Sequence, residues 1–147
     1  MATDEKVSFS AEERAAMKEY AAELKAEKKR KGTADKAAQD EADLVAKIAE
    51  LTGDDRVLAE KVHALVREHA PELAPKTWYG MPAYNRDGRA IVFFQPASKF
   101  KARYSTLGFN DGAKLDDGAM WPTSYALTTI GPAEERKLIE LIRRAAG

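Results

Sequence analysis

Residues 78–95 read WYGMPAYNRDGRAIVFFQ, and this stretch decides the fold. Ahead of it, apolar residues recur at helical spacing, whereas from Trp78 onward they follow the period of two that is typical of β-strands. The segment Asn85-Arg86-Asp87-Gly88 is a hairpin signal, because Asp-Gly pairs adopt the positive φ angles of tight turns. Residues 90–95, AIVFFQ, are β-branched and aromatic and stop at Pro96. The stretch therefore predicts neighbouring antiparallel strands joined by short turns.

Further strands and a final helix are predicted after this stretch. Residues 99–109 read KFKARYSTLGF, in which apolar or neutral side chains alternate with Lys99, Lys101 and Arg103. This alternation predicts one strand with a buried face and a basic, hydrated face. A second alternating run covers residues 121–127. Pro132 has the position of the first residue of a helix, and the apolar side of that helix is formed by Leu138, Ile139, Leu141 and Ile142.

Three helices are predicted ahead of the strands. Ser10 and Glu13 have the spacing of a capping box, in which each side chain accepts a hydrogen bond from the other residue's backbone. The first helix has only a thin apolar stripe and is expected to end at Gly32. A second helix is expected over about residues 35–51 and a third over about residues 57–69, and the third has the strongest apolar stripe.

These elements predict an α+β domain: N-terminal helices, an antiparallel sheet of about four to five strands, and a C-terminal helix. We expect a helical extension over residues 1–45 and the α+β domain over residues 46–147. The chain contains no cysteine, which excludes disulfides, thiolate metal ligands and a cysteine nucleophile. It shows neither a signal-peptide pattern nor an apolar run of membrane length, so we expect a soluble, cytoplasmic protein.

Charge is segregated along the chain, although the formal net charge is zero. Residues 1–75 carry 13 basic and 17 acidic side chains, whereas residues 76–147 carry 11 and 7. Such a division indicates either an internal electrostatic match between the two halves or separate surfaces for separate partners. We favour the internal match.

Three motifs carry a family resemblance: WYGMPAY at residues 78–84, KFKARYSTLGF at residues 99–109 and LDDGAMWPTSYAL at residues 115–127. Over about residues 45–145 the chain resembles the bacterial YdhG-like family, a domain of unknown function. The resemblance implies a frataxin-like α/β sandwich. At least one relative is described as an iron-handling protein for iron–sulfur cluster assembly, so the resemblance also implies iron as cargo and iron–sulfur assembly proteins as partners. It implies nothing about residues 1–45.

Iron binding needs clustered carboxylates, because a hard cation binds weakly to dispersed oxygen ligands. Between Lys76 and Gly131 there are seven basic and four acidic residues, so the better acidic candidates lie on the helices. They are Glu12, Glu13, Glu19 and Glu23 on the first helix, and Asp40, Glu41 and Asp43 on the second. A solvated helix face explains the same residues.

Four other residues are candidate metal ligands. Glu60 and His63 have the i,i+3 spacing of a di-iron ligand pair, although a bundle site needs this motif twice. Asp116 and Asp117 are adjacent carboxylates, and their neighbour Gly118 indicates a loop. A surface pair and a hydrated loop are the alternative interpretations.

An anion-binding surface is the second hypothesis. It combines the cations Lys99, Lys101 and Arg103 with the turn of WYGMPAY, where, between two tyrosines, a glycine relaxes the backbone and a proline removes a hydrogen-bond donor. The candidate ligand-binding residues are Trp78, Tyr79, Met81, Tyr84, Lys99, Lys101, Arg103, Tyr104 and Trp121. Basic side chains that protect a strand edge, and ordinary core packing of the aromatic residues, are the alternatives.

The functional expectation is therefore a small binding protein. Frataxin-like iron handling is the first interpretation, and a module that binds an anionic small molecule or an acidic partner protein is the second. No nucleophile elbow, phosphate-binding loop, dinucleotide fingerprint or zinc-protease motif is found, so we lean against an enzyme. The run KKRK at residues 28–31 resembles a solvated helix end more than a nucleic-acid contact. A monomer or weak dimer is expected.

Overall fold

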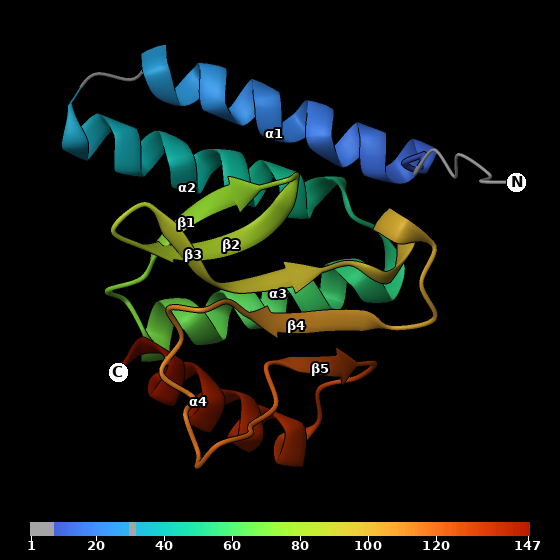
Figure 1. Cartoon of the computed structure of the whole chain (residues 1–147), viewed down its shortest axis with the longest axis vertical. Helices are drawn as coiled ribbons and strands as arrows, with labels where there is room; N and C mark the ends of the chain where they lie inside the picture. Colours follow the sequence, from blue (N-terminus) through green and yellow to red (C-terminus); the bar gives the residue numbers. More distant parts are fainter. Residues whose placement is uncertain (1–7, 30–31) are drawn as a thin grey trace, which may run out of the picture.

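The computed structural model describes residues 8–29 and 32–147. The helices are α1 (Ala11–Lys29), α2 (Thr33–Glu50), α3 (Gly53–His69) and α4 (Pro132–Ala146), with a 3-10 helix η1 (Ala97–Phe100). The strands are β1 (Ala74–Trp78), β2 (Met81–Arg86), β3 (Arg89–Gln95), β4 (Ser105–Phe109) and β5 (Ser124–Leu127). The described residues confirm the predicted α+β class (Figure 1).

The sheet is an antiparallel meander with strand order β1-β2-β3-β4-β5. Two-residue turns join its first three strands. Tyr79 and Gly80 form the first turn, with φ of 52° and 75°, and Asp87 and Gly88 form the second, with φ of 52° and 77°. Positive φ at both central positions is the conformation that suits the twist of a hairpin. The hairpin predicted at residues 85–88 is therefore confirmed, and WYGMPAY contains a second one.

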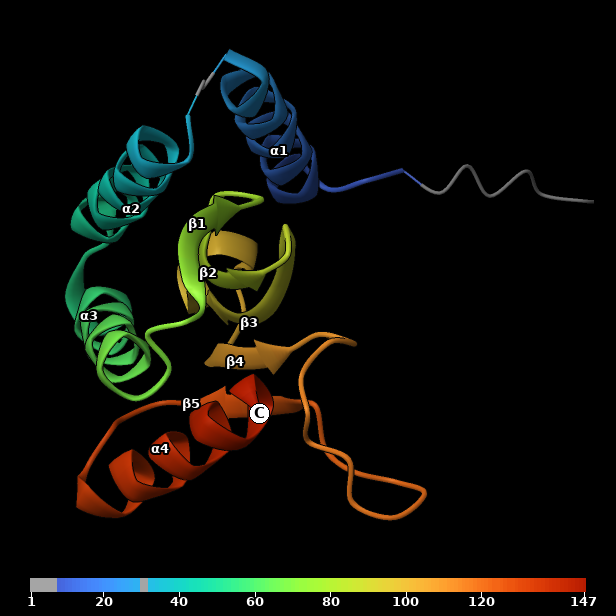
Figure 2. The same ribbon diagram turned by 90° about the vertical axis from the view of Figure 1, so that its left-hand side faces the viewer.

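The main hydrophobic core lies between the sheet and α2, α3 and α4. Its largest fully buried side chains include Tyr84, Phe94, Leu107, Leu44 and Ile142. Figure 2 shows α2 and α3 stacked along one side of the sheet with α4 beneath it, while α1 lies over the β1–β2 end. The apolar stripe predicted for the third helix is buried, and that helix begins earlier than expected, at Gly53.

The N-terminal helix has a different relation to the sheet. Its predicted capping box is confirmed, because the Ser10 amide donates to Glu13 Oε1 at 3.1 Å and the Glu13 amide donates to Ser10 Oγ at 3.0 Å. Of its 19 residues, only Ala16 is buried. Met17 and Leu24 are 38% and 42% exposed. Hydrophobic burial therefore contributes little to holding α1 in place.

The strand predicted over residues 99–109 is confirmed only from Ser105 onward, and its basic part, residues 99–104, is wrong. Residues 97–100 form η1, Lys101 is left-handed at φ 54°, and β4 begins only at Ser105. The local turn is held by hydrogen bonds from the Ala102 amide to the Ala97 carbonyl, at 2.8 Å, and from the Ala97 amide to Ser105 Oγ, at 3.0 Å. Because a helical turn replaces the pleat, Lys99, Lys101 and Arg103 do not share one strand face.

Two other predictions concern the domain boundary at residue 45 and the basic run at residues 28–31. α2 runs through residue 45 without a break, and Leu44 and Ile48, on either side of the expected boundary, belong to one core. Residues 30 and 31 of the KKRK run lie outside the described residues. Among the described helices, none combines the length and apolar character needed to cross a membrane.

Candidate functional site

The turn between β1 and β2 binds a carboxylate. The amides of Tyr79 and Gly80 donate to Glu23 Oε2 at 3.0 Å and Glu23 Oε1 at 2.9 Å, so each oxygen of one side chain accepts from a different amide. The two donors are 56 and 57 positions away from Glu23 in the sequence. Paired backbone N–H groups in a left-handed turn form a concave anion site, and α1 supplies the anion.

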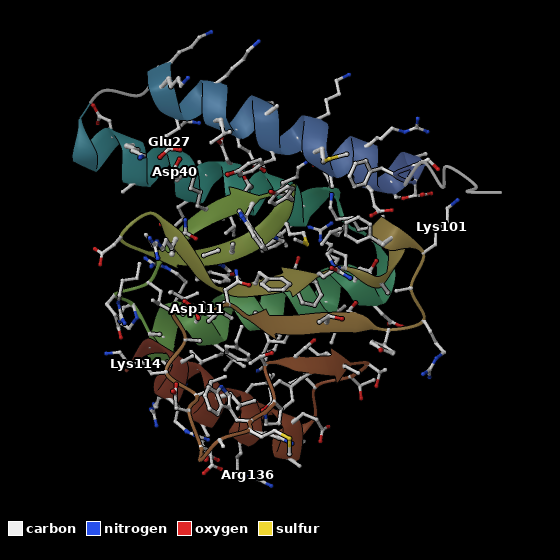
Figure 3. All side chains as sticks on the ribbon, in the orientation of Figure 1. Glu27, Asp40, Lys101, Asp111, Lys114 and Arg136 are labelled. Atoms are coloured by element: carbon white, nitrogen blue, oxygen red, sulfur yellow. The ribbon has the colours of Figure 1, made fainter. Side chains whose placement is uncertain are left out.

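Three lysines extend this contact along α1. Lys101 pairs with Glu12 at 2.9 Å, Lys99 with Glu19 at 2.9 Å, and Lys76 with Glu27 at 3.0 Å. Figure 3 places Lys101 near the start of α1 and Glu27 near its other end, so the pairs follow the length of the helix. The internal electrostatic match predicted from the charge segregation is thereby confirmed.

Helix α2 contributes to the same pairs. Lys47 contacts Glu19 at 3.0 Å, and Lys36 donates to Glu27 Oε1 at 2.9 Å. Glu19 and Glu27 each bind two ammonium groups. One comes from α2, and the other comes from Lys99 of η1 for Glu19 and from Lys76 of β1 for Glu27. Each of these carboxylates therefore ties α1 to two parts of the molecule.

An aromatic stack completes the contact. The rings of Tyr20 and Tyr79 lie 4.2 Å apart with an interplanar angle of 8°. Tyr79 has a positive φ, which is unfavourable for a bulky side chain. The ring stack and the hydrogen bond that the Tyr79 amide donates to Glu23 offset this cost. We call the Tyr79 and Gly80 amides, the Tyr79 ring, Lys76, Lys99 and Lys101 the carboxylate dock.

Charge pairing shifts the pKa values of the groups in the dock. The hydrogen bond from Lys101 lowers the pKa of Glu12. Partial burial opposes ionisation of Glu19, but Lys99 and Lys47 outweigh it and hold the Glu19 pKa below its ordinary value. Lys36 and Lys76 lower the pKa of Glu27. These carboxylates are therefore bound in their ionised form.

The predicted ligand-binding residues fall into separate groups. Trp78 is half-buried and lines a cleft beside α1, while Tyr79, Lys99 and Lys101 belong to the carboxylate dock. Met81 is buried at 5% exposure. Three of the other four lie elsewhere: Arg103 stacks over the ring of its neighbour Tyr104 at 5.2 Å, and Trp121 packs at the margin of the main core.

Tyr84 is fully buried and hydrogen-bonded within the core. Its hydroxyl and Nδ1 of His63 lie 3.0 Å apart. Burial lowers the pKa of His63, against a smaller opposing effect of Glu41, and burial raises the pKa of Tyr84. The pair is therefore neutral at physiological pH and has a structural role.

The four candidate metal ligands do not form one group. Glu60 accepts from Arg56 at 2.8 Å on the exposed side of α3, and His63 faces Tyr84. Asp116 and Asp117 are exposed in the segment between β4 and β5. In residues 8–29 and 32–147, no three histidine or carboxylate side chains are arranged to hold a metal ion. The four candidates therefore do not converge on one three-ligand site in the described part of the chain.

Sequence reasoning missed the role of the acidic residues on α1. Glu12, Glu19, Glu23 and Glu27 are separated by seven, four and four residues, which places them on one face of a helix together with Ala16 and Tyr20. From the sequence, Glu12, Glu13, Glu19 and Glu23 are interpreted as either a solvated face or a metal site, and Glu27 is not included among them. The shared spacing was the available signal, but the larger apolar residues of α1, Met17 and Leu24, lie off this face and are exposed, so the apolar pattern does not show that these carboxylates face the protein.

Comparison with protein-family models, curated proteins and solved structures found no match. The resemblance to the YdhG-like family therefore stays a prediction that rests on the three quoted motifs. The function proposed below rests on the geometry of the dock.

Proposed function

We propose that the protein is a binding module that captures an acidic helical segment of a partner protein on its carboxylate dock. α1 occupies the dock in the unbound protein, and the partner replaces it. The observation that supports this proposal best is the pair of hydrogen bonds from Tyr79 and Gly80 to the two oxygens of Glu23. A partner segment would offer carboxylates at the same helical spacing as Glu12, Glu19, Glu23 and Glu27.

The weak apolar attachment of α1 supports exchange. A helix that buries one residue is held by polar contacts, and exposed ion pairs each contribute only about 0.2–1 kcal/mol. The attached helix still has an advantage over a free competitor, because its tether gives it an effective concentration on the order of millimolar. A partner therefore needs either higher affinity or conditions that weaken the docking of α1.

Iron handling lacks a comparable observation. The carboxylates on α1, which were candidates for iron, are bound to lysines and turn amides. An anaerobic titration with ferrous iron still separates the two hypotheses. The binding-module hypothesis predicts no site tighter than about millimolar, whereas a saturable micromolar site would favour iron handling.

The binding experiment uses a fluorescent synthetic peptide of residues 8–29 as the acidic helix. Wild-type protein is expected to bind it weakly, since its own α1 competes. The full-length Glu19→Gln, Glu23→Gln variant, whose α1 docks less tightly, is expected to bind the wild-type peptide at least about tenfold more tightly. Fluorescence anisotropy at about 50 mM salt measures both affinities.

Two controls make the outcome decisive. Lys99→Glu and Lys101→Glu, added to the same variant, should abolish peptide binding while circular dichroism stays unchanged. Glu140→Gln, at an exposed glutamate on α4, should leave peptide binding at the wild-type level. If the Glu19→Gln, Glu23→Gln variant gains no affinity although hydrogen exchange shows its α1 released, the proposal fails.

A further inference from the structure

A cleft of about 370 Å³ lies between α1 and the face of the sheet opposite the main core. Lys76 and Trp78 line it from β1, and the strand register places them on the other face from Tyr84, whose partner is Pro75. Helix α1 supplies one wall through Tyr20 and Glu27. The volume lies within the range of small-molecule sites. The proposed function uses Lys76 of this lining but places no ligand in the cleft itself.

Two aromatic rings with fixed positions form its apolar part. Tyr20 is stacked on Tyr79, and Trp78 contacts Phe93 with ring centroids 5.2 Å apart. Side chains held by neighbouring rings lose little conformational entropy when a ligand binds. A planar ring is the ligand group that such side chains recognise best, because aromatic faces favour offset or tilted stacking.

The polar lining is rich in hydrogen-bond acceptors. Asn85 lines the cleft, and its Oδ1 is the buried side-chain atom for which the described residues supply no hydrogen-bond partner. Asn110 uses its Nδ2 to donate to the Ala90 carbonyl at 3.1 Å, which leaves its side-chain oxygen as an acceptor. Asp111 is exposed at the cleft margin and adds a carboxylate. A buried acceptor without a partner costs free energy, and a ligand donor recovers it once the Asn85 side chain rotates to turn its Oδ1 towards the cleft.

We infer that this cleft binds a planar nitrogen heterocycle of nucleobase size that carries an exocyclic amino group. The ring lies against Trp78 and Tyr20, and the amino group donates to the acceptors of Asn85, Asn110 and Asp111. Arg89, which also lines the cleft, is exposed and positioned for an anionic substituent. This inference does not rest on the proposed function, but the cleft exists only while α1 is docked, because α1 supplies Tyr20 and one wall of the lining.

Fluorescence of Trp78 measures binding directly. Trp121 is the chain's other tryptophan, so the experiment uses full-length protein with Trp121→Phe. Adenosine and cytidine carry an exocyclic amino group, and inosine and uridine carry a carbonyl at the same ring position. We expect saturable quenching by adenosine or cytidine, with affinity at least about tenfold tighter than for the matched inosine or uridine.

Variants assign the contacts. Asn85→Ser should weaken binding of the preferred nucleoside about tenfold, and Asp111→Asn should weaken it less. Asp116→Asn, in the same segment but outside the cleft lining, should leave affinity unchanged and serves as the matched control. No quenching by any nucleoside up to about 10 mM, or equal binding of the amino and carbonyl forms, would overturn the inference. So would an unchanged affinity in a folded Asn85→Ser variant.

Discussion

Glu19 on α1 and Lys99 on η1, 80 positions apart in the sequence, form an ion pair of 2.9 Å. Both side chains are largely shielded, with 29% and 15% exposure, so water screens this pair less than an open surface pair. The pair connects the acidic first half of the chain to its basic second half. It also places the charge of α1 beside the turn whose amides bind Glu23.

A double-mutant cycle measures this pair. Glu19→Gln and Lys99→Gln, alone and together, should give a coupling energy of about 1 kcal/mol in urea unfolding. The same cycle for Glu12 and Lys101 should give less, because Lys101 is 82% exposed. Equal coupling energies for the two pairs would mean that shielding does not determine the strength of docking.

The two hairpin turns offer a matched pair of substitutions. Gly80 and Gly88 have nearly equal φ, 75° and 77°, so alanine should cost each turn about 1–2 kcal/mol of backbone strain. A Cβ at Gly80 would collide with the Glu19 carboxylate, whereas a Cβ at Gly88 meets nothing within 4 Å. Gly80→Ala should therefore displace the Glu19 carboxylate and weaken the docking of α1 in addition to straining its turn, and Gly88→Ala should only strain its turn. Hydrogen exchange of the α1 amides separates the two effects.

Acid should release α1 before the domain unfolds. The docked state lowers the pKa values of Glu12, Glu19 and Glu27, so the undocked state binds more protons. Docking is then fully stabilised above about pH 4.5, the ordinary pKa of a glutamate, and weakens as pH falls through the lowered values. Spin labels on Lys18→Cys and Asp116→Cys, both exposed, would report the separation of α1 from the sheet. A constant distance down to the pH of global unfolding contradicts this prediction.

His63 gives the main domain a separate pH dependence. Burial holds its folded-state pKa below 6.5, the ordinary value, so stability is fully present above that pH and decreases as pH falls through the lowered pKa. The urea midpoint should fall between pH 7.5 and pH 5. His63→Gln, which keeps a hydrogen-bond acceptor for Tyr84, should flatten that change, while His69→Gln should preserve it. An unflattened profile in the His63→Gln variant would count against this assignment.

Much of the fold could be predicted from local sequence signals. The Ser10–Glu13 capping box, the Asp87-Gly88 turn and the apolar stripe of α3 each depend on residues close together in the chain. The alternation at residues 99–104 wrongly predicted a strand, because a 3-10 turn followed by a left-handed residue interrupts the pleat there. A contact with α3 helps to hold that turn: the Ser98 amide donates a hydrogen bond to Asp55 at 3.2 Å. Contacts of this kind join distant segments and leave no local pattern.

The candidate site was predicted only in part, because some of its features are local in the sequence and others are contacts between distant segments. The WYGMPAY turn and two lysines of the carboxylate dock, Lys99 and Lys101, were identified, because glycine and proline placement and charge are visible in the local sequence. The occupant of the turn was missed, since Glu23 lies on a helix that the family motifs do not include. Tyr84 was expected at a surface and is buried, because period two alone does not say which face of a hairpin meets the core.

Hydrogen exchange of the Tyr79 and Gly80 amides tests the central claim, that α1 is a displaceable occupant of the dock, most directly. At neutral pH and about 50 mM salt, these amides and those of α1 should exchange together, at least about tenfold faster than the amides of α3. Raising the salt to about 1 M should accelerate the α1 group alone. Exchange of α1 only through global unfolding, with no effect of salt, would contradict the account.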